Sequence, residues 1–248
     1  MKIIAFLAQK GGNGKTSSAA AVGQLLNRTG NKVLFIDMDQ QGNLSDILQA
    51  SGSQTISDVL NGTAKIQDAA ILTPYGHLLS ADETGGLNPD PEEFRKILKT
   101  AGKKWDYCII DNPPELSAIT AASIYASDFI IMPAQAERFS IKAISQLFNT
   151  INTIRDTAGH AGRVLGVLIT RYDRRTIISR QALQFIRETA QAAGTDLFST
   201  QIRECTAIKE AQVEEKDIYS YAPKSNAAAD YRAVTSEMLE RIHETEKR

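Results

Sequence analysis

The feature that most constrains the fold of this 248-residue chain is a series of short apolar runs separated by longer amphipathic stretches. The runs occupy residues 3–7, 33–36, 77–80, 107–110, 129–132 and 164–169. Most are continuously apolar rather than alternating, which is typical of strands covered by helices on both faces. Helical periodicity lies between them, for example at residues 17–28, 91–101, 141–155 and 179–193. Strands that alternate with helices form βαβ units, so the pattern predicts an α/β fold: a doubly wound, mostly parallel sheet flanked by helices.

Composition and charge narrow the class of protein. The length suits one large α/β domain, and without a repeat or a Pro/Gly/Ser linker we expect a single domain over residues 1–248. The formal net charge is −1, so any affinity for nucleic acid must come from a local basic patch. The two distant cysteines form no metal or disulfide pattern, and no apolar run is long enough to span a bilayer. We therefore expect a cytoplasmic protein with reduced thiols.

A glycine-rich loop separates the first apolar run from the first helical stretch. Its residues are Lys10, Gly11, Gly12, Asn13, Gly14, Lys15 and Thr16, followed by Ser17. Glycines let consecutive backbone N–H groups face phosphate oxygens, and the helix that follows attracts the anion to its N-terminus. In such a loop Lys15 reaches the β and γ phosphates, Thr16 places its hydroxyl on Mg²⁺, and Ser17 lies near the α phosphate. The ordinary motif needs a glycine where this chain has Gln9, so the loop is a variant with a second lysine, Lys10, and predicts binding of ATP with Mg²⁺.

Acidic residues follow the predicted strands on the edge where ligands bind in doubly wound sheets. Asp37 and Asp39 follow the second run, and Asp111 follows the run at 107–110. Hydrolysis needs a carboxylate beside the attacking water, and Mg²⁺ prefers oxygen ligands, so acids at this edge are candidates for both roles. The alternative for each acid is an ordinary cap or turn residue at a strand end.

These segments together resemble the ParA/MinD superfamily of P-loop ATPases, and most of all the ParA/Soj-type partition ATPases. Residues 10–16 are similar to its deviant Walker A box, 37–44 to its Asp-x-Asp-Pro-Gln-Gly-Asn box with Gln40 for proline, and 107–114 to its Walker B strand with Asp-x-Pro-Pro. Further similarity at 133–137, 170–176 and 221–231 extends the resemblance over nearly the whole chain. It implies a slow ATPase that forms a homodimer on ATP, with Lys10 reaching the partner's phosphates and Asp39 activating water. It also implies that Asp111 holds Mg²⁺ through water, with Asp39 as a further possible ligand.

The resemblance also implies that the dimer binds DNA non-specifically and that a ParB-like partner stimulates hydrolysis, in a nucleoid-associated protein of bacteria or archaea. The basic candidates for DNA are Arg174, Arg175, Lys209, Lys224 and Arg232. Their alternative interpretation is a solvated basic face. The chain departs from the family at 202–211, where Arg203 replaces a proline and Glu204 and Ala207 replace two arginines. The same stretch helps to hold adenine in relatives, so Arg203 and Cys205 are candidates for base contacts.

Other branches of the superfamily remain as rival hypotheses. A MinD-like membrane-cycling ATPase needs a terminal amphipathic helix, whereas residues 238–248 are charged and poor in large apolar side chains, so we expect no stable membrane association. A reductase like the nitrogenase iron protein needs paired cysteines at a dimer face, which the positions of Cys108 and Cys205 do not favour. A positioning ATPase for a protein-complex cargo would use the same residues. The chain begins at the first predicted strand, so we expect no N-terminal helix-turn-helix extension.

Overall fold

The computed structural model describes residues 1–82, 84 and 87–247, and its centre is a seven-stranded sheet in the order β3-β4-β2-β5-β1-β6-β7. The strands are β1 (Lys2–Phe6), β2 (Val33–Asp37), β3 (Ile71–Thr73), β4 (Gly76–Leu79), β5 (Tyr107–Asp111), β6 (Phe129–Gln135) and β7 (Arg163–Thr170). Neighbouring strands are parallel except at the edge, where β3 runs antiparallel to β4. The predicted fold class, a mostly parallel α/β sheet, is therefore confirmed.

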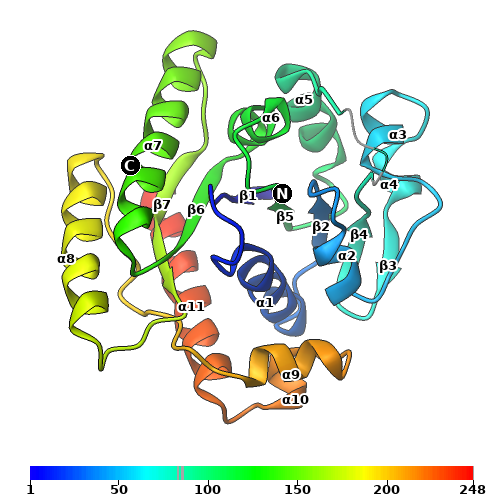
Figure 1. Cartoon of the computed structure of the whole chain (residues 1–248). Helices are drawn as coiled ribbons and strands as arrows, with labels where there is room; N and C mark the ends of the chain where they lie inside the picture. Colours follow the sequence, from blue (N-terminus) through cyan, green and yellow to red (C-terminus); the bar gives the residue numbers. More distant parts are fainter. Residues whose placement is uncertain (83, 85–86, 248) are drawn as a thin grey trace.

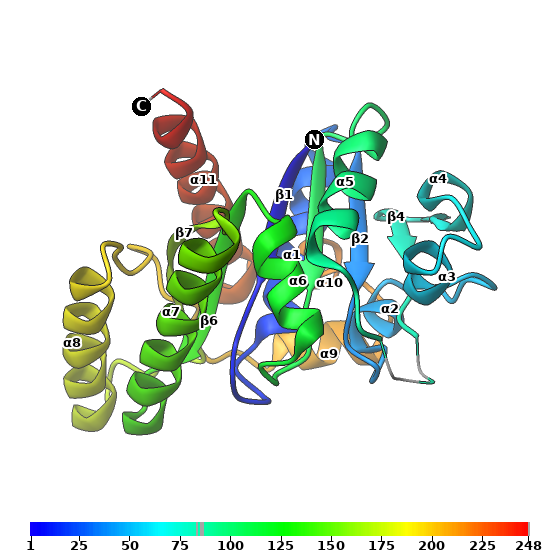
Figure 2. The ribbon, with the colours of Figure 1, turned by 90° about the horizontal axis from the view of Figure 1, so that it is seen from above.

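Helices cover both faces of this sheet (Figures 1 and 2). The described helices are α1 (Lys15–Arg28), α2 (Asn43–Ile47), α3 (Ile56–Leu60), α4 (Ile66–Ala69), α5 (Pro91–Ala101), α6 (Ala118–Ala126), α7 (Arg138–Ala158), α8 (Ile177–Ala192), α9 (Ala207–Val213), α10 (Ile218–Tyr221) and α11 (Asn226–Glu246). In Figure 2 the helices α5, α6 and α7 lie in front of the sheet, whereas α1 and α11 lie behind it. No helix of the described residues combines the length and apolarity that crossing a membrane requires.

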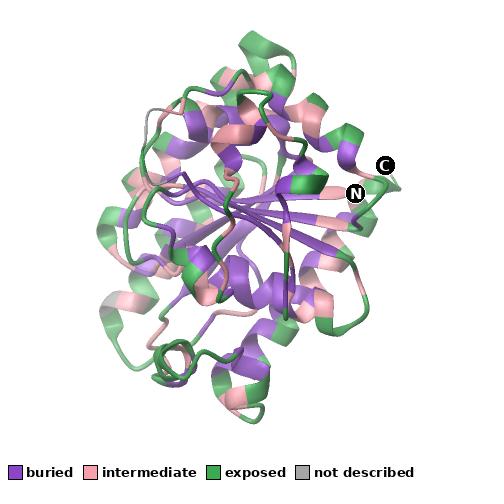
Figure 3. Cartoon of the chain, turned by 90° about the vertical axis from the view of Figure 1, so that its right-hand side faces the viewer, coloured by how far each residue is buried: buried purple, intermediate pink, exposed green. Residues whose placement is uncertain are grey.

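The alternation of side chains along the strands divides the core in two. In β1, Ile3 and Ala5 pack with the cluster that includes α5, α6 and α7, whereas Ile4 and Phe6 pack with α1 and α11. Because both faces of the central strands are buried, these strands carry continuously apolar sequences. Figure 3 shows these strands as a buried layer between helices whose outer faces are exposed. The sheet is thus a rigid platform that fixes whatever follows each strand.

Local sequence explains where helices begin. At α5, the side chain of Asp90 accepts a hydrogen bond from the N–H of Glu93, and Pro91 occupies the first turn, where no N–H is needed. By contrast, α1 starts at Lys15 after Gly14, which has a left-handed φ of 71°, and no side chain caps it. The first N–H groups of α1 are therefore left for another partner, such as an anion.

Strand register brings the predicted acids to one edge. Phe6 of β1 and Asp37 of β2 both pair with Asp111 of β5, so the carboxyl ends of these three strands are level. The glycine loop leaves this edge directly after β1. The sheet therefore places the loop beside Asp37 and Asp111, as the sequence predicts.

Candidate functional site

A cleft of about 660 Å³ opens at this edge of the sheet. Its size lies within the usual range for a site that encloses a small ligand. One end is formed by the glycine loop with Asp39 and Pro114. The other end is formed by the segment after β7 and by residues 202–212, including Arg203 and Cys205. The cleft thus joins the two parts of the chain that the sequence assigned to phosphates and to the base.

The glycine loop has the backbone of an anion-binding nest. Gly12 and Gly14 have φ angles of +79° and +71°, in the left-handed region, with Asn13 between them at an ordinary negative φ. Alternation of this kind gathers successive N–H groups on one side of the chain. A Cβ would be strained at either glycine, which explains why the loop needs them. The loop can therefore bind an oxyanion through its backbone.

Lys15, the lysine at the start of α1, points into the cleft. It is 7% exposed, and its Nζ donates to Asp111 Oδ1 at 2.7 Å. Thr16 Oγ1 donates to the other carboxylate oxygen, Oδ2, also at 2.7 Å. Burial raises the pKa of the Asp111 carboxyl, and the charge of Lys15 opposes that rise. Both groups are buried, so water screens their mutual attraction only weakly.

Asp39 lies beside the Lys15–Asp111 pair, and Asp37 holds the backbone of Asp39 in place. The Nζ of Lys15 is 3.9 Å from Asp39 Oδ2, and Asp39 is 8% exposed at the wall of the cleft. Asp37 is fully buried, accepts hydrogen bonds from the N–H of Asp39 and from Ser45, and so fixes the loop that carries Asp39. Burial, and then the charge of Asp111, raise the pKa of Asp37 to about 6.

The oxygen atoms of Thr16 and Asp111 fit a magnesium site. A hydroxyl and a carboxylate are ligands that Mg²⁺ prefers, and these two already meet at 2.7 Å. Within residues 1–82, 84 and 87–247, no three His, Cys, Asp or Glu side chains are arranged to hold a metal ion by themselves. A Mg²⁺ ion here would therefore take its remaining ligands from phosphates and water, which is its usual habit.

The far end of the cleft holds the candidates for base contacts. Arg203 lines it, but its guanidinium is bound to Asp230, with Nη2 at 2.6 Å from Oδ1 and Nε at 2.9 Å from Oδ2. Cys205 also lines it and is half-buried. Arg171 and Glu204 form a second pair at this end, at 2.8 Å, and Arg171 has a φ of 50°. Arg203 therefore offers the cleft its backbone and the flank of its side chain.

The two lysines of the loop behave differently. Whereas Lys15 is buried, Lys10 is about half exposed, and its Nζ pairs with Glu137 Oε2 at 2.9 Å. Sequence reasoning did not assign Glu137 a role. Nor did it identify Gln135 and Thr170, whose side chains bind the loop's carbonyl groups. The signal available was their place at the ends of two predicted strands, on the same edge as the loop.

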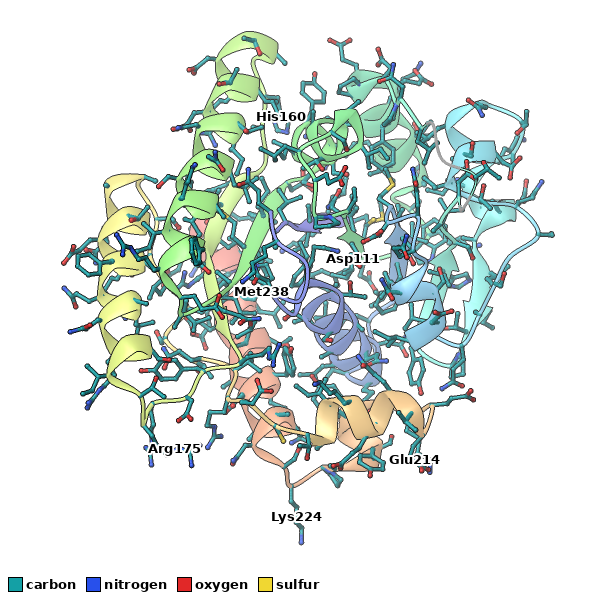
Figure 4. All side chains as sticks on the ribbon, viewed as in Figure 1. Asp111, His160, Arg175, Glu214, Lys224 and Met238 are labelled. Atoms are coloured by element: carbon teal, nitrogen blue, oxygen red, sulfur yellow. The ribbon has the colours of Figure 1, made fainter. Side chains whose placement is uncertain are left out.

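The predicted DNA candidates are spread over three segments. In Figure 4, Arg175 and Lys224 point outward at the lower edge of the molecule, whereas Asp111 lies inside it. Arg175 binds the neighbouring carboxylate of Asp173 at 2.8 Å, and Arg232 donates to the carbonyl of Pro223 at 2.9 Å. Lys209 lines the cleft itself. Arg174 and Lys224 make no ion pair or side-chain hydrogen bond with another residue in the described part of the chain.

Known proteins are similar to this chain in sequence and in fold. Residues 1–161 match a family model described as an AAA domain. The chain is 31% identical to the chromosome-partitioning ATPase Soj of Thermus thermophilus, over 97% of this chain and 96% of that protein. It is also 31% identical to the chromosome partitioning protein ParA of Caulobacter vibrioides, over 97% and 95% of the two chains. This chain belongs to the ParA/MinD family of P-loop ATPases.

The fold agrees with this membership. The structure of apo McdA from Cyanothece superposes with a TM-score of 0.85 over 96% of this chain and 99% of that one, at 24% identity, which establishes similarity of fold. As a member of the ParA/MinD family, the chain is an ATPase of the partitioning or positioning type. The glycine loop, Lys15 and the acids at the cleft are the residues whose chemistry suits that activity.

Proposed function

We propose that this ParA/MinD-family ATPase is a switch that ATP assembles into a dimer, and that the dimer binds DNA without sequence preference to partition or position a plasmid or chromosome. A ParB-like partner would stimulate its slow hydrolysis and release it from the nucleoid in the cytoplasm. The names of Soj and ParA, at 31% identity over nearly the whole chain, support chromosome partition as the process.

The observation that carries the proposal is the contrast between Lys10 and Lys15. Lys15 is buried within its own cleft, so one lysine already serves the phosphates bound there. Lys10 lies at the surface, where its pair with Glu137 is about half exposed. An exposed ion pair is worth only about 0–1 kcal/mol, so Lys10 can leave Glu137 at little cost. Lys10 is thus available to the phosphates of a second subunit.

In this proposal each group has a defined part in hydrolysis. The N–H groups of the loop and Lys15 bind the β and γ phosphates, and Asp39 accepts a proton or hydrogen bond from the attacking water. Thr16 and Asp111 would hold Mg²⁺, which would supply positive charge beside the phosphates. Lys10 of the partner subunit adds positive charge at the transferring phosphoryl group only in the dimer. Hydrolysis therefore depends on assembly.

DNA binding would depend on exposed cations that other residues do not neutralise. Arg174, just before α8, and Lys224, between α10 and α11, meet that condition within the described residues. Such cations contact phosphates and give affinity that falls with salt. A dimer doubles their number on one assembly, so its affinity should exceed that of a monomer.

The test is a gel shift with a duplex of arbitrary sequence at low salt, in the presence of ATP or ADP. We expect a shift with ATP only, weakened by added salt and by the double substitution Arg174→Ala and Lys224→Ala. The control, Lys96→Ala with Lys103→Ala, removes the same charge from the exposed surface of α5 and the turn after it. A protein that dimerises on ATP but gives no shift would refute the DNA-binding part of the proposal.

A second candidate function is positioning of a membrane-associated or protein-complex cargo, as in a MinD-like system. The observation that favours it is Glu204, which is bound to Arg171 at 2.8 Å. In the partition-branch pattern that residues 202–211 resemble, this position is an arginine. This replacement removes positive charge from that surface. In the gel shift, this alternative predicts ATP-dependent dimers that leave the duplex free.

A further inference from the structure

The strands β6 and β7 end side by side at the glycine loop, and their last residues both contact it. Gln135 of β6 pairs in register with Thr170 of β7. Paired residues of adjacent strands project from the same face of a sheet, so both side chains reach the same neighbour. Gln135 Nε2 donates to the carbonyl oxygen of Gly12 at 2.8 Å, and Thr170 Oγ1 donates to that of Asn13 at 2.8 Å. Two successive carbonyls of the loop are thus held by the sheet.

Peptide geometry converts this hold into an orientation of N–H groups. A trans peptide is planar, and its C=O and N–H point in opposite directions. The described chain contains no cis peptide. Turning the carbonyl of Gly12 toward Gln135 therefore turns the N–H of Asn13 away from β6. In the same way, turning the carbonyl of Asn13 toward Thr170 turns the N–H of Gly14 away from β7.

We propose that Gln135 and Thr170 are positioning residues for the phosphate site: they hold the Gly12 and Asn13 carbonyls outward, so that the next two N–H groups face the phosphates before a nucleotide binds. The proposal rests on the phosphate-binding role of the loop. Neither residue touches the phosphates; each acts through a peptide plane.

Glycine makes this hold necessary. Gly12 and Gly14 stand at the two ends of the pair of peptides that Gln135 and Thr170 hold, and glycine rotates about its backbone more freely than any other residue. Without an anchor, the peptides between them can turn their carbonyl oxygens toward the anion, which repels it. Preorganised N–H groups avoid the cost of ordering the loop at the moment of binding.

The two anchors differ in strength. Thr170 is 1% exposed and lies directly against Gly14, where an added Cβ would sit 3.4 Å from Thr170 Cβ. Gln135 is partly exposed, so water competes for its hydrogen bond. Loss of the Thr170 hydroxyl should therefore matter more than loss of the Gln135 amide.

The experiment measures binding of MgADP and of inorganic tripolyphosphate by titration calorimetry. Thr170→Val keeps the shape but removes the donor, and we expect both ligands to bind about tenfold more weakly. Thr170→Ser restores the hydroxyl and should restore affinity to within about threefold. Gln135→Glu places an acceptor against the carbonyl of Gly12 and should weaken both ligands by about three- to tenfold. Thr189→Val and Gln184→Glu make the same changes on α8 and should leave both affinities unchanged.

Several results would overturn the proposal. The proposal is wrong if Thr170→Val and Gln135→Glu bind both ligands with wild-type affinity. It is also wrong if the two α8 control variants lose as much affinity as these variants do. If Thr170 has only a structural role, Thr170→Val should lower the melting temperature of the free protein, and no loss of ligand affinity should appear that Thr170→Ser restores. Crystal structures of wild type and Thr170→Val provide an independent test. If the Asn13–Gly14 peptide has the same orientation in both, Thr170 does not fix that orientation. If wild type binds neither ligand, the loop does not bind phosphates. The crystal structures then still show whether Thr170 fixes the orientation of the Asn13–Gly14 peptide.

Discussion

Asp37 should make the stability of the nucleotide-free protein depend on pH. Its carboxyl is fully buried at the end of β2, and burial, together with the charge of Asp111, raises its pKa from 3.8 to about 6. The folded state therefore binds a proton at Asp37 more tightly than the unfolded state does. Protonation favours folding, so this group's stabilisation is fully present below pH 3.8 and is lost as the pH rises through about 6.

The size of the effect follows from the two pKa values. Between pH 7.5 and pH 5, the proton linkage of this one carboxyl contributes about 1.4 kcal/mol to the free energy of unfolding. For a chain of this length, that corresponds to a shift of about 3–6 °C in melting temperature. The substitution Asp37→Asn removes the titration but keeps the size of the side chain and one acceptor oxygen for Ser45.

The assay is unfolding by urea or heat, without nucleotide, at pH 5 and at pH 7.5. Relative to Asp37→Asn, wild type should gain about 1.4 kcal/mol on acidification. Asp173→Asn serves as the control, because hydrogen bonds from Arg175 lower the pKa of the exposed Asp173 to about 2, well below this range. If wild type and Asp37→Asn differ by the same amount at both pH values, the reasoning about Asp37 is wrong.

Two further predictions concern the metal site and the packing of α1. Asp111→Asn should raise the Mg²⁺ concentration needed for half-maximal phosphate release by at least about tenfold, because a neutral amide is a weaker ligand than a carboxylate. If the Mg²⁺ dependence of phosphate release is unchanged, Asp111 is not a ligand. Gly23→Ala should destabilise the fold by about 1–3 kcal/mol, because a Cβ there would lie 2.2 Å from Cε1 of Phe35. Urea unfolding should show a smaller cost in a Phe35→Leu background, and an equal cost in both would contradict the contact.

The central strands were predictable because each is buried on both faces. The predicted run at 107–110 corresponds to β5, and the run at 33–36 to β2, each within one residue at its end. Predicted helix 91–101 matches α5 because its capping Asp90 and Pro91 mark the start unambiguously. The helix predicted at 141–155 is longer in the structure, where α7 spans Arg138–Ala158.

Short or uniformly apolar elements were not predictable. β3 has only three residues and is held by pairing with β4, a contact that local periodicity does not encode. α6 is apolar on nearly all sides, so it lacks the polar face that identifies a surface helix. The short helices α2, α3 and α4 likewise have too few turns to show a period.

The residues of the site also fall into those that local sequence predicts and those that only the fold brings together. The loop and the acids could be chosen because each needs a particular residue type directly after a strand. The partners of the loop could not, because Gln135 is 123 residues from Gly12 in the chain and Thr170 is 157 from Asn13. Only the order and register of β6 and β7 bring them together. The ion pair between Arg203 and Asp230 was hidden for the same reason.

The central claim, that ATP controls assembly through Lys10, is tested most directly by sedimentation of the Asp39→Ala protein with MgATP. That variant should bind ATP without hydrolysing it and therefore accumulate as a dimer, whereas MgADP should leave it monomeric. Adding Lys10→Ala should return it to a monomer in MgATP, and adding Lys96→Ala instead should not. A dimer that forms equally well without Lys10, or a monomer in every nucleotide, would contradict the account.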